Sequence, residues 1–242
     1  MTQQVEATRR VPLSRDRVLA AAVELADEVG IESLSMRRLA QELGVVPMAL
    51  YKHVANKDEL LDGMVDTIIA EIDPPVRDAG WKRTVRLRVL SARRALLRHR
   101  WARRVLESRT STTPAVLGYM DSFMGMFLAG GFSVDLTHHV MHALGSRMWG
   151  FTQELFDDPA NGNFADMAPD VQAAMLREMA ERYPNILKVA TAASHDDGSV
   201  VGAGCDDQFE FEFALDLMLD GFERLHGQGW TSEKLAGGAA EE

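Results

Sequence analysis

The sequence has little that would anchor the chain in a membrane or hold it together covalently. It has one cysteine, Cys205, in 242 residues, which excludes an intrachain disulfide framework and leaves a metal site only one thiolate. No apolar run is long enough to cross a bilayer, and the N-terminal segment MTQQVEATRR lacks the apolar core of a signal peptide. We therefore expect a cytoplasmic protein with no membrane partner.

Positive charge is also scarce over the whole chain. The formal net charge is −10, which argues against a protein that coats nucleic acid indiscriminately. Between residues 33 and 57, however, the charged side chains are four bases and the single acid Glu42; the bases are Arg37, Arg38, Lys52 and Lys57. A basic segment on an acidic chain favours binding to a defined DNA site.

Residues 14–72 carry the signals of a compact helical domain. Ser14 can cap a first helix that Gly30 ends, and Ser35 can cap a second helix. Gly44 then permits a tight turn, and Pro47 suits the first turn of a third helix, predicted from residue 47 to about 54. Two successive helices joined by a glycine turn are typical of a helix-turn-helix.

A fourth helix is predicted after the turn. Asn56 followed by Glu59 resembles a capping box, and the apolar residues that follow keep a helical spacing. The Asp73-Pro74-Pro75 segment ends this helix, and we expect the domain boundary there.

The rest of the chain shows helical periodicity and no convincing strand, so we expect an all-α protein. The expected domains are a tail (1–13), a helix-turn-helix domain with a connecting helix (14–72), a larger helical domain (76–228) and a second tail (229–242). The helices expected in the larger domain are 81–99, 114–129, 134–156, 169–182 and 206–226.

The third helix has the composition of a helix that reads the major groove. The small residues at its start allow close approach to DNA, and the donors and aromatic residue that follow can touch base edges and phosphates. Leu50 and Val54 remain to anchor the helix. The residues expected to contact DNA are Ser35, Met36, Arg37, Pro47, Met48, Ala49, Tyr51, Lys52, His53 and Lys57.

The order of these residues resembles the helix-turn-helix of the TetR family of bacterial transcriptional regulators. The matching run is Gly44-Val45, Pro47, Leu50-Tyr51, His53-Val54, Asn56-Lys57 and Leu60-Leu61, preceded by Ser35, Arg37 and Leu39-Ala40. The segments RRALLRHR (93–100) and FEFALDLMLDGFE (211–223) are similar to the C-terminal domain of tetracycline-repressor-like members.

This resemblance implies a homodimer whose two recognition helices lie one DNA turn apart on a pseudo-palindromic operator. It also implies a pocket in the larger domain for a small-molecule effector, whose binding moves the fourth helix and releases a repressor. Where tetracycline-binding members carry histidines, this chain has Glu71-Ile72-Asp73 and Arg104-Val105-Leu106-Glu107. We therefore do not expect a metal-chelated tetracycline, and we expect no cofactor.

Methionine and aromatic residues of the middle helices suit an adaptable hydrophobic pocket for an effector not identified by the sequence. The residues expected to line it are Trp101, Phe123, Phe127, His138, His142 and Trp149. The last helix and the helix over 134–156 are expected to form the dimer interface, because their apolar residues spread too widely for one buried stripe.

Two features allow other interpretations. His138 and His142 lie one helical turn apart, as in some zinc sites, so a metal-dependent helical enzyme is one alternative; lining a pocket or a helix interface is the favoured role. Residues 81–109 hold many bases and the single acid Glu107, and a solvated face paired with the acidic last helix is favoured over a second nucleic-acid surface. A constitutive or activating DNA-binding protein is the remaining alternative to a ligand-responsive repressor.

Overall fold

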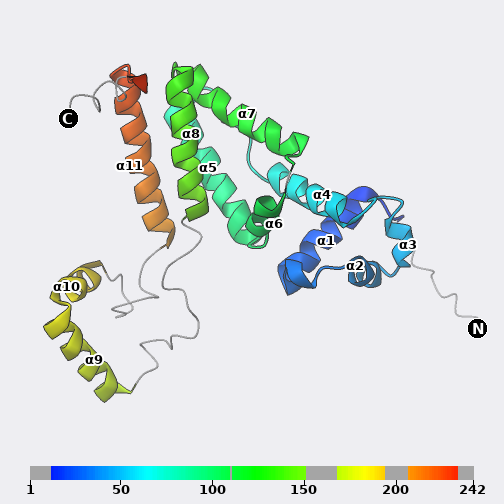
Figure 1. The fold of residues 1–242 in the computed structure, drawn as a ribbon, viewed down its shortest axis with the longest axis horizontal. Helices are drawn as coiled ribbons and strands as arrows, with labels where there is room; N and C mark the ends of the chain where they lie inside the picture. The colour runs from blue at the N-terminus through cyan, green and yellow to red at the C-terminus, as the bar shows by residue number, and fades with distance from the viewer. Residues whose placement is uncertain (1–11, 110, 151–167, 194–206, 234–242) are drawn as a thin grey trace, which may run out of the picture. The chain divides into compact units, whose positions relative to one another are not determined.

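The computed structural model describes residues 12–109, 111–150, 168–193 and 207–233. These residues form helices joined by turns, with no strand among them, which confirms the all-α prediction (Figure 1). The chain divides into two compact units, residues 1–132 and 133–242. Within the described ranges, no helix is both long and apolar enough to cross a membrane.

The first unit holds seven α-helices and one short 3₁₀ helix within its described residues. They are α1 (Arg15–Val29), η1 (Ile31–Ser33), α2 (Met36–Glu42), α3 (Pro47–Leu50), α4 (Lys57–Ala70), α5 (Trp81–Arg98), α6 (Ala102–Ser108) and α7 (Pro114–Ala129). The second unit contains α8 (Val134–Gly150), α9 (Pro169–Arg182), α10 (Pro184–Ala193) and α11 (Asp207–Gly227).

The helices α1, α2 and α4 begin at the capping residues that the sequence predicts. The Ser14 hydroxyl accepts from the backbone N–H of Arg17, and the Ser35 hydroxyl accepts from that of Arg38, each at 3.2 Å. Asn56 Oδ1 accepts from the N–H of Glu59 at 2.8 Å, so each oxygen satisfies a helix N–H that has no partner within the helix.

The α1 and α4 helices pack closely against each other. A Cβ on Gly63 of α4 would lie 2.6 Å from a methyl carbon of Leu19 on α1, so a larger residue at this position would require the Leu19 side chain to shift. Val18, Leu39, Leu50 and Met64 are fully buried around the crossing and under α2 and α3. This shared core joins the short helices α2 and α3 to the longer α1 and α4.

The third helix is shorter than predicted. It ends at Leu50, and the backbone N–H groups of His53 and Val54 both donate to the Leu50 carbonyl, at 2.8 and 3.0 Å. Tyr51 and the two residues after it therefore lie in a turn. The apolar pattern up to Val54 was misleading because Val54 is buried from the turn rather than from a helix.

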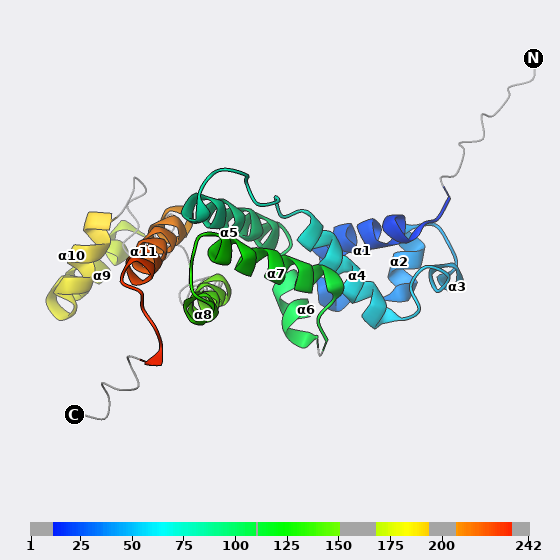
Figure 2. The same ribbon diagram turned by 90° about the horizontal axis from the view of Figure 1, so that it is seen from above.

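The α5 and α7 helices pack together in the first unit, and one end of α7 contacts α4 (Figure 2). Trp81 at the start of α5 lies against Phe127 and Phe132, with ring centroids 5.8 and 4.6 Å apart. A Cβ on Gly130 would lie 2.6 Å from Trp81 Cβ, so this glycine brings the end of α7 close to α5.

In the second unit, α9 and α10 pack against each other, and α8 is bonded to the segment after α11. Ser232 donates to the Asp135 carboxylate from its backbone N–H at 2.7 Å and from its hydroxyl at 2.8 Å. The tail expected from residue 229 is thus held in place as far as Ser232. The expected part of the 134–156 helix beyond Gly150 lies outside the described residues, as do residues 1–11 and 234–242 of the two tails.

Candidate DNA-binding surface and effector site

The turn after α3 presents a group of exposed side chains. Met48 is 73% exposed and Tyr51 44%, although both are large and apolar in part. Leu50 and Val54 are buried behind them and hold the turn against the core. We call this group of residues the reading surface: Pro47, Met48, Ala49, Tyr51, Lys52 and His53. Ala49 and His53 are partly buried, and the other four are exposed.

The α2 helix packs beside α3 and precedes it in the chain, as expected for a helix-turn-helix. Arg37 is exposed, Met36 is partly buried, and Ser35 is engaged as the helix cap. An exposed guanidinium beside a short protruding helix can contact phosphate or a guanine edge. The structure thus brings most of the expected DNA-contacting residues to one part of the first unit.

Lys57 has a structural contact that the sequence did not reveal. Its ammonium group donates to the backbone carbonyl of Leu34 at 3.1 Å, which ties the start of α4 to the segment before α2. The side chain is still exposed, so its remaining N–H groups face solvent. Lys57 therefore positions the reading surface, and its expected contact with phosphate stays a prediction.

An acidic face of α4 is held by residues around α6 and α7. The Arg109 guanidinium lies 2.9 Å from Asp58 and 2.7 Å from Asp62, and Thr113 donates to Asp66 at 2.5 Å. The hydrogen bond to Asp58, more than any other contact, raises the pKa of Arg109 above its ordinary value. These contacts join the C-terminal end of α6 and the start of α7 directly to α4.

His99 joins the other end of α4 to α1. Its Nδ1 lies 2.9 Å from the Asp27 carboxylate, and its Nε2 lies 3.1 Å from Glu71. Trp101 Nε1 also donates to Asp27, at 2.7 Å. Trp101 was expected to line the effector pocket, but its indole is used in this contact with α1 because the buried N–H needs an acceptor.

Asp73, just after α4, is held by three side chains of α5. Its carboxylate accepts from the Ser91 hydroxyl at 2.9 Å and from Arg94 at 2.7 Å, while its backbone carbonyl accepts from Arg88. The Arg88 guanidinium also lies over the Tyr119 ring of α7, 4.9 Å from its centroid. Burial raises the pKa of Tyr119 to about 12, and the positive charge of Arg88 opposes that rise only in part.

The expected effector residues fall into three groups. Phe123 and Phe127 are buried on α7, where they continue an aromatic row from Tyr119 with neighbouring centroids 5.8 and 6.0 Å apart. His138 and His142 are exposed on α8, with ring centroids 4.7 Å apart. The side chain of Trp149 lies outside the described residues.

The basic segment over residues 81–109 is not simply a solvated face. Arg88 and Arg93 are buried, whereas Arg94 and Arg98 form ion pairs with Asp73 and Glu71. Arg104 is paired with Glu32, and Arg103 with Glu107. The pairs of Arg94, Arg98 and Arg104 therefore join α5 and α6 to η1 and to the residues directly after α4, which the sequence pattern alone did not indicate.

Sequence reasoning missed the residues that make these connections. Asp27, Arg88, His99, Arg109 and Tyr119 each have an ordinary surface or core interpretation when read singly. Their partners lie up to 74 residues away in the sequence, as for Asp27 and Trp101, so no local spacing identifies them.

The His138/His142 pair was weighed as a possible metal site. Within the part of the chain that the structure describes, no group of three or more His, Cys, Asp or Glu residues is placed to hold a metal ion. His139 instead lies 3.6 Å from Asp135, which is itself bonded to Ser232. The described residues therefore offer no support for the metal-dependent enzyme.

Comparison with known proteins agrees with this geometry. Residues 18–64 match the family model of bacterial regulatory proteins of the tetR family, and residues 74–226 match the tetracyclin repressor-like C-terminal domain. The HTH-type transcriptional repressor DrrR1 of Streptomyces coeruleorubidus is 30% identical over 224 residues, covering 89% of this chain and 79% of the relative. The class D tetracycline repressor of Escherichia coli is 30% identical over 220 residues, covering 87% and 89%.

Solved structures give the same result. ActR of Streptomyces coelicolor, in complex with actinorhodin, superposes with a TM-score of 0.67 at 28% identity, covering 90% of this chain and 100% of the other. The C-terminal family model alone spans more than half of the chain, and the N-terminal model covers the helices that carry the reading surface. The chain therefore belongs to the TetR family of bacterial transcriptional regulators, and it is a ligand-responsive DNA-binding protein rather than an enzyme.

Proposed function

We propose that this protein is a cytoplasmic homodimeric repressor that a small hydrophobic effector releases from a palindromic operator. The observation that carries the proposal is the reading surface, where Met48, Tyr51 and Lys52 are exposed on a turn backed by buried Leu50 and Val54. Apolar side chains held in solvent in this way need a partner, and the thymine methyl groups and base edges of a major groove supply one.

The contacts around α4 support a response to an effector. Arg109 and Thr113 hold its acidic face, and His99 and the α5 side chains on Asp73 hold its other end. A ligand that shifts α5, α6 or α7 must therefore change the position of α4 and, through α1, of the reading surface.

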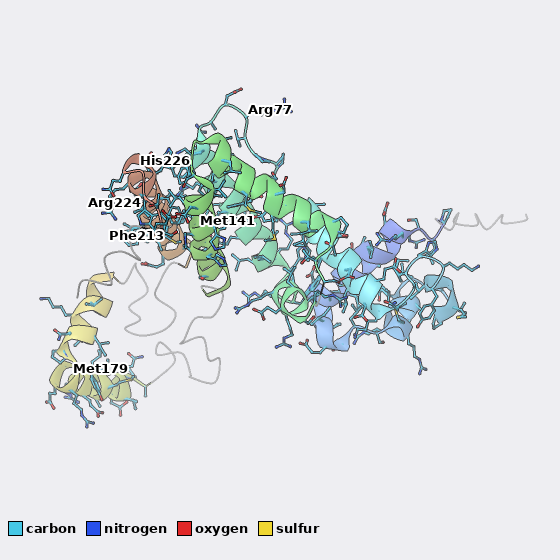
Figure 3. The ribbon with its side chains drawn as sticks, turned by 45° about the horizontal axis from the view of Figure 1, so that its top comes forward. Arg77, Met141, Met179, Phe213, Arg224 and His226 are labelled. Carbon is cyan, nitrogen blue, oxygen red and sulfur yellow. The ribbon has the colours of Figure 1, made fainter. Side chains whose placement is uncertain are left out.

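The proposed homodimer uses α11. Phe209, Phe213 and Leu217 follow one another at intervals of four residues on this helix and are 54%, 55% and 57% exposed. Figure 3 labels Phe213 on α11. Four-residue spacing places them on one face, so a second copy of the chain can bury the row. The family's named repressors support this dimer as the form that reads two half-sites.

A footprint on the promoter beside the protein's own coding region tests the proposal, repeated with hydrophobic metabolites and antibiotics. Protection of a palindromic site that one of these compounds abolishes is the expected result. Protection that no compound changes indicates a constitutive regulator, and increased transcription from the protected promoter indicates an activator. No protection of any DNA contradicts the proposed role of the reading surface.

A further inference from the structure

Arg88 is a buried base in the middle of α5. Only 8% of the residue is exposed, although a guanidinium is strongly solvated and is rarely removed from water without a partner. Its neighbours on both sides along the helix, Leu87 and Val89, follow an ordinary amphipathic pattern, with Leu87 exposed and Val89 buried. Arg88 thus occupies a position that the pattern assigns to the inside of the protein.

Arg88 forms no ion pair with a carboxylate among the residues that the structure describes. Its one hydrogen bond goes to the backbone carbonyl of Asp73, while the Asp73 carboxylate is taken by Ser91 and Arg94. A buried charge without a counter-ion is strongly destabilising, so an opposite charge is expected to bind there.

One donor of the guanidinium lacks an acceptor. Nη1 bonds the Asp73 carbonyl, whereas Nε is buried and has no acceptor among the described residues. The Nε and Nη2 donors point the same way and match the two oxygens of one carboxylate. The opposite side of the group is closed by the Tyr119 ring, 4.9 Å from the guanidinium carbon.

Tyr119 does not supply the missing negative charge. Burial raises its pKa to about 12, so the phenol stays neutral at physiological pH. The ring instead fixes the guanidinium by a cation–π contact, and the α7 aromatic row continues from it through Phe123. A ligand that binds at Arg88 would therefore contact one positively charged group and the apolar side chains next to it.

We propose that Arg88 is the recognition residue for the effector, and that the effector is an organic acid whose carboxylate binds the Nε–Nη2 edge while its apolar body lies beside α7. This rests on the proposed function, which it narrows from any small hydrophobic compound to an anionic one. Binding there acts on Asp73, because Arg88 holds the carbonyl of this residue directly after α4.

Thermal unfolding of the full chain with 2-naphthoate or its neutral partner 2-naphthamide tests the proposal. The acid is expected to raise the unfolding temperature of the wild type and the amide is not, because only the acid carries a charge for Arg88. Arg88→Met keeps an unbranched apolar stem but removes the guanidinium, and it should weaken binding of 2-naphthoate by about tenfold or more. Arg83→Met removes an exposed arginine of the same helix and serves as the matched control.

Three results would overturn the proposal. The first is an equal response to the acid and the amide, or none to either. The second is unchanged binding of 2-naphthoate to Arg88→Met. The third is an equal loss of 2-naphthoate binding in Arg83→Met, because this variant keeps the Arg88 guanidinium.

Operator binding separates this proposal from the proposed function. Arg88→Met should still protect the operator but should no longer be released by 2-naphthoate. If the wild type binds no operator while 2-naphthoate still binds through Arg88, the proposed repressor fails and the carboxylate site stands. If the operator is bound and released by compounds that ignore Arg88, the carboxylate site fails and the repressor stands.

Discussion

Tyr51 and Lys52 are adjacent residues of the reading surface for which we expect different effects on DNA binding. Tyr51→Ala should cost about 1–3 kcal/mol of operator binding if the ring touches a base edge. Lys52→Ala should weaken binding to all sequences and reduce the salt slope by about one, as expected for a phosphate contact. Titrations of operator and unrelated DNA at several salt concentrations measure both effects.

Lys188→Ala is the control for these two variants, because it removes an exposed lysine of α10 that is not part of the reading surface. Its operator affinity should equal that of the wild type. Unchanged affinity in a Tyr51→Ala/Lys52→Ala double variant would refute the assignment of the reading surface.

Asp135 carries a pH-dependent contact in the second unit. The hydrogen bonds from Ser232, first that from its backbone N–H, lower the pKa of the Asp135 carboxyl. A lowered pKa means that the contact is fully present above the ordinary pKa of aspartate and is lost as the pH falls through the lower folded value. The anchor of the segment after α11 should therefore survive mild acid.

Nuclear magnetic resonance of the Ser232 amide measures this behaviour. Its resonance should stay in place between pH 6 and about pH 4, because the carboxylate remains ionised where ordinary aspartate begins to take up its proton. Asp135→Asn, which has no carboxylate to titrate, should show a different and pH-independent resonance. A transition of the wild-type resonance centred near or above the ordinary value would contradict the prediction.

Single residues were the hardest part of the site to predict from sequence. The helix caps Ser14, Ser35 and Asn56 were predicted and are confirmed, because capping depends on residues three positions apart. Arg88 was taken as part of a charged helical face, since nothing in its own segment distinguishes a buried arginine from a solvated one. Its environment depends on Asp73 and Tyr119, which come from other elements.

Long helices were predicted from the sequence with nearly correct bounds, whereas short helices were missed. The helices α5, α7, α9 and α11 lie within a residue or so of their predicted bounds, because each spans three or more turns of clear periodicity. The structure adds α6 and α10, which have seven and ten residues. The α10 helix is separated from α9 by Tyr183 alone, so no polar loop marks its start.

The contact between α4 and the C-terminal end of α6 is the element-level link that we expect an effector to use. Arg109→Met removes both ion pairs of this link but keeps the side-chain stem. Amide hydrogen exchange over residues 57–66 should rise by about two- to fivefold, the effect of losing a modest ion pair. Arg103→Met, which removes a pair within α6, should leave α4 unchanged; equal exchange in the two variants would show that Arg109 does not hold α4.

The complete repressor is expected to depend on two copies of the chain. Phe213→Glu combined with Leu217→Glu places charge in the exposed row of α11 and should halve the mass observed by analytical ultracentrifugation. Operator affinity should then fall by about a hundredfold, because the half-sites are no longer bound together. Val189→Glu alters an equally exposed apolar residue on α10, so it should remain dimeric. A dimeric Phe213→Glu/Leu217→Glu variant would move the interface away from α11.

The length of α4 turns a small tilt of this helix into a sizeable movement of its ends. With 14 residues, α4 is about 21 Å long, so a tilt of about 5° displaces one end by about 2 Å relative to the other. Because α1 and α4 pack together through one buried core, α1 is carried along with α4. A displacement of this size exceeds the range of donor–acceptor distances over which a hydrogen bond to a base edge forms. A bound molecule therefore needs to shift its own surroundings only slightly for the paired helices to lose their match to the operator.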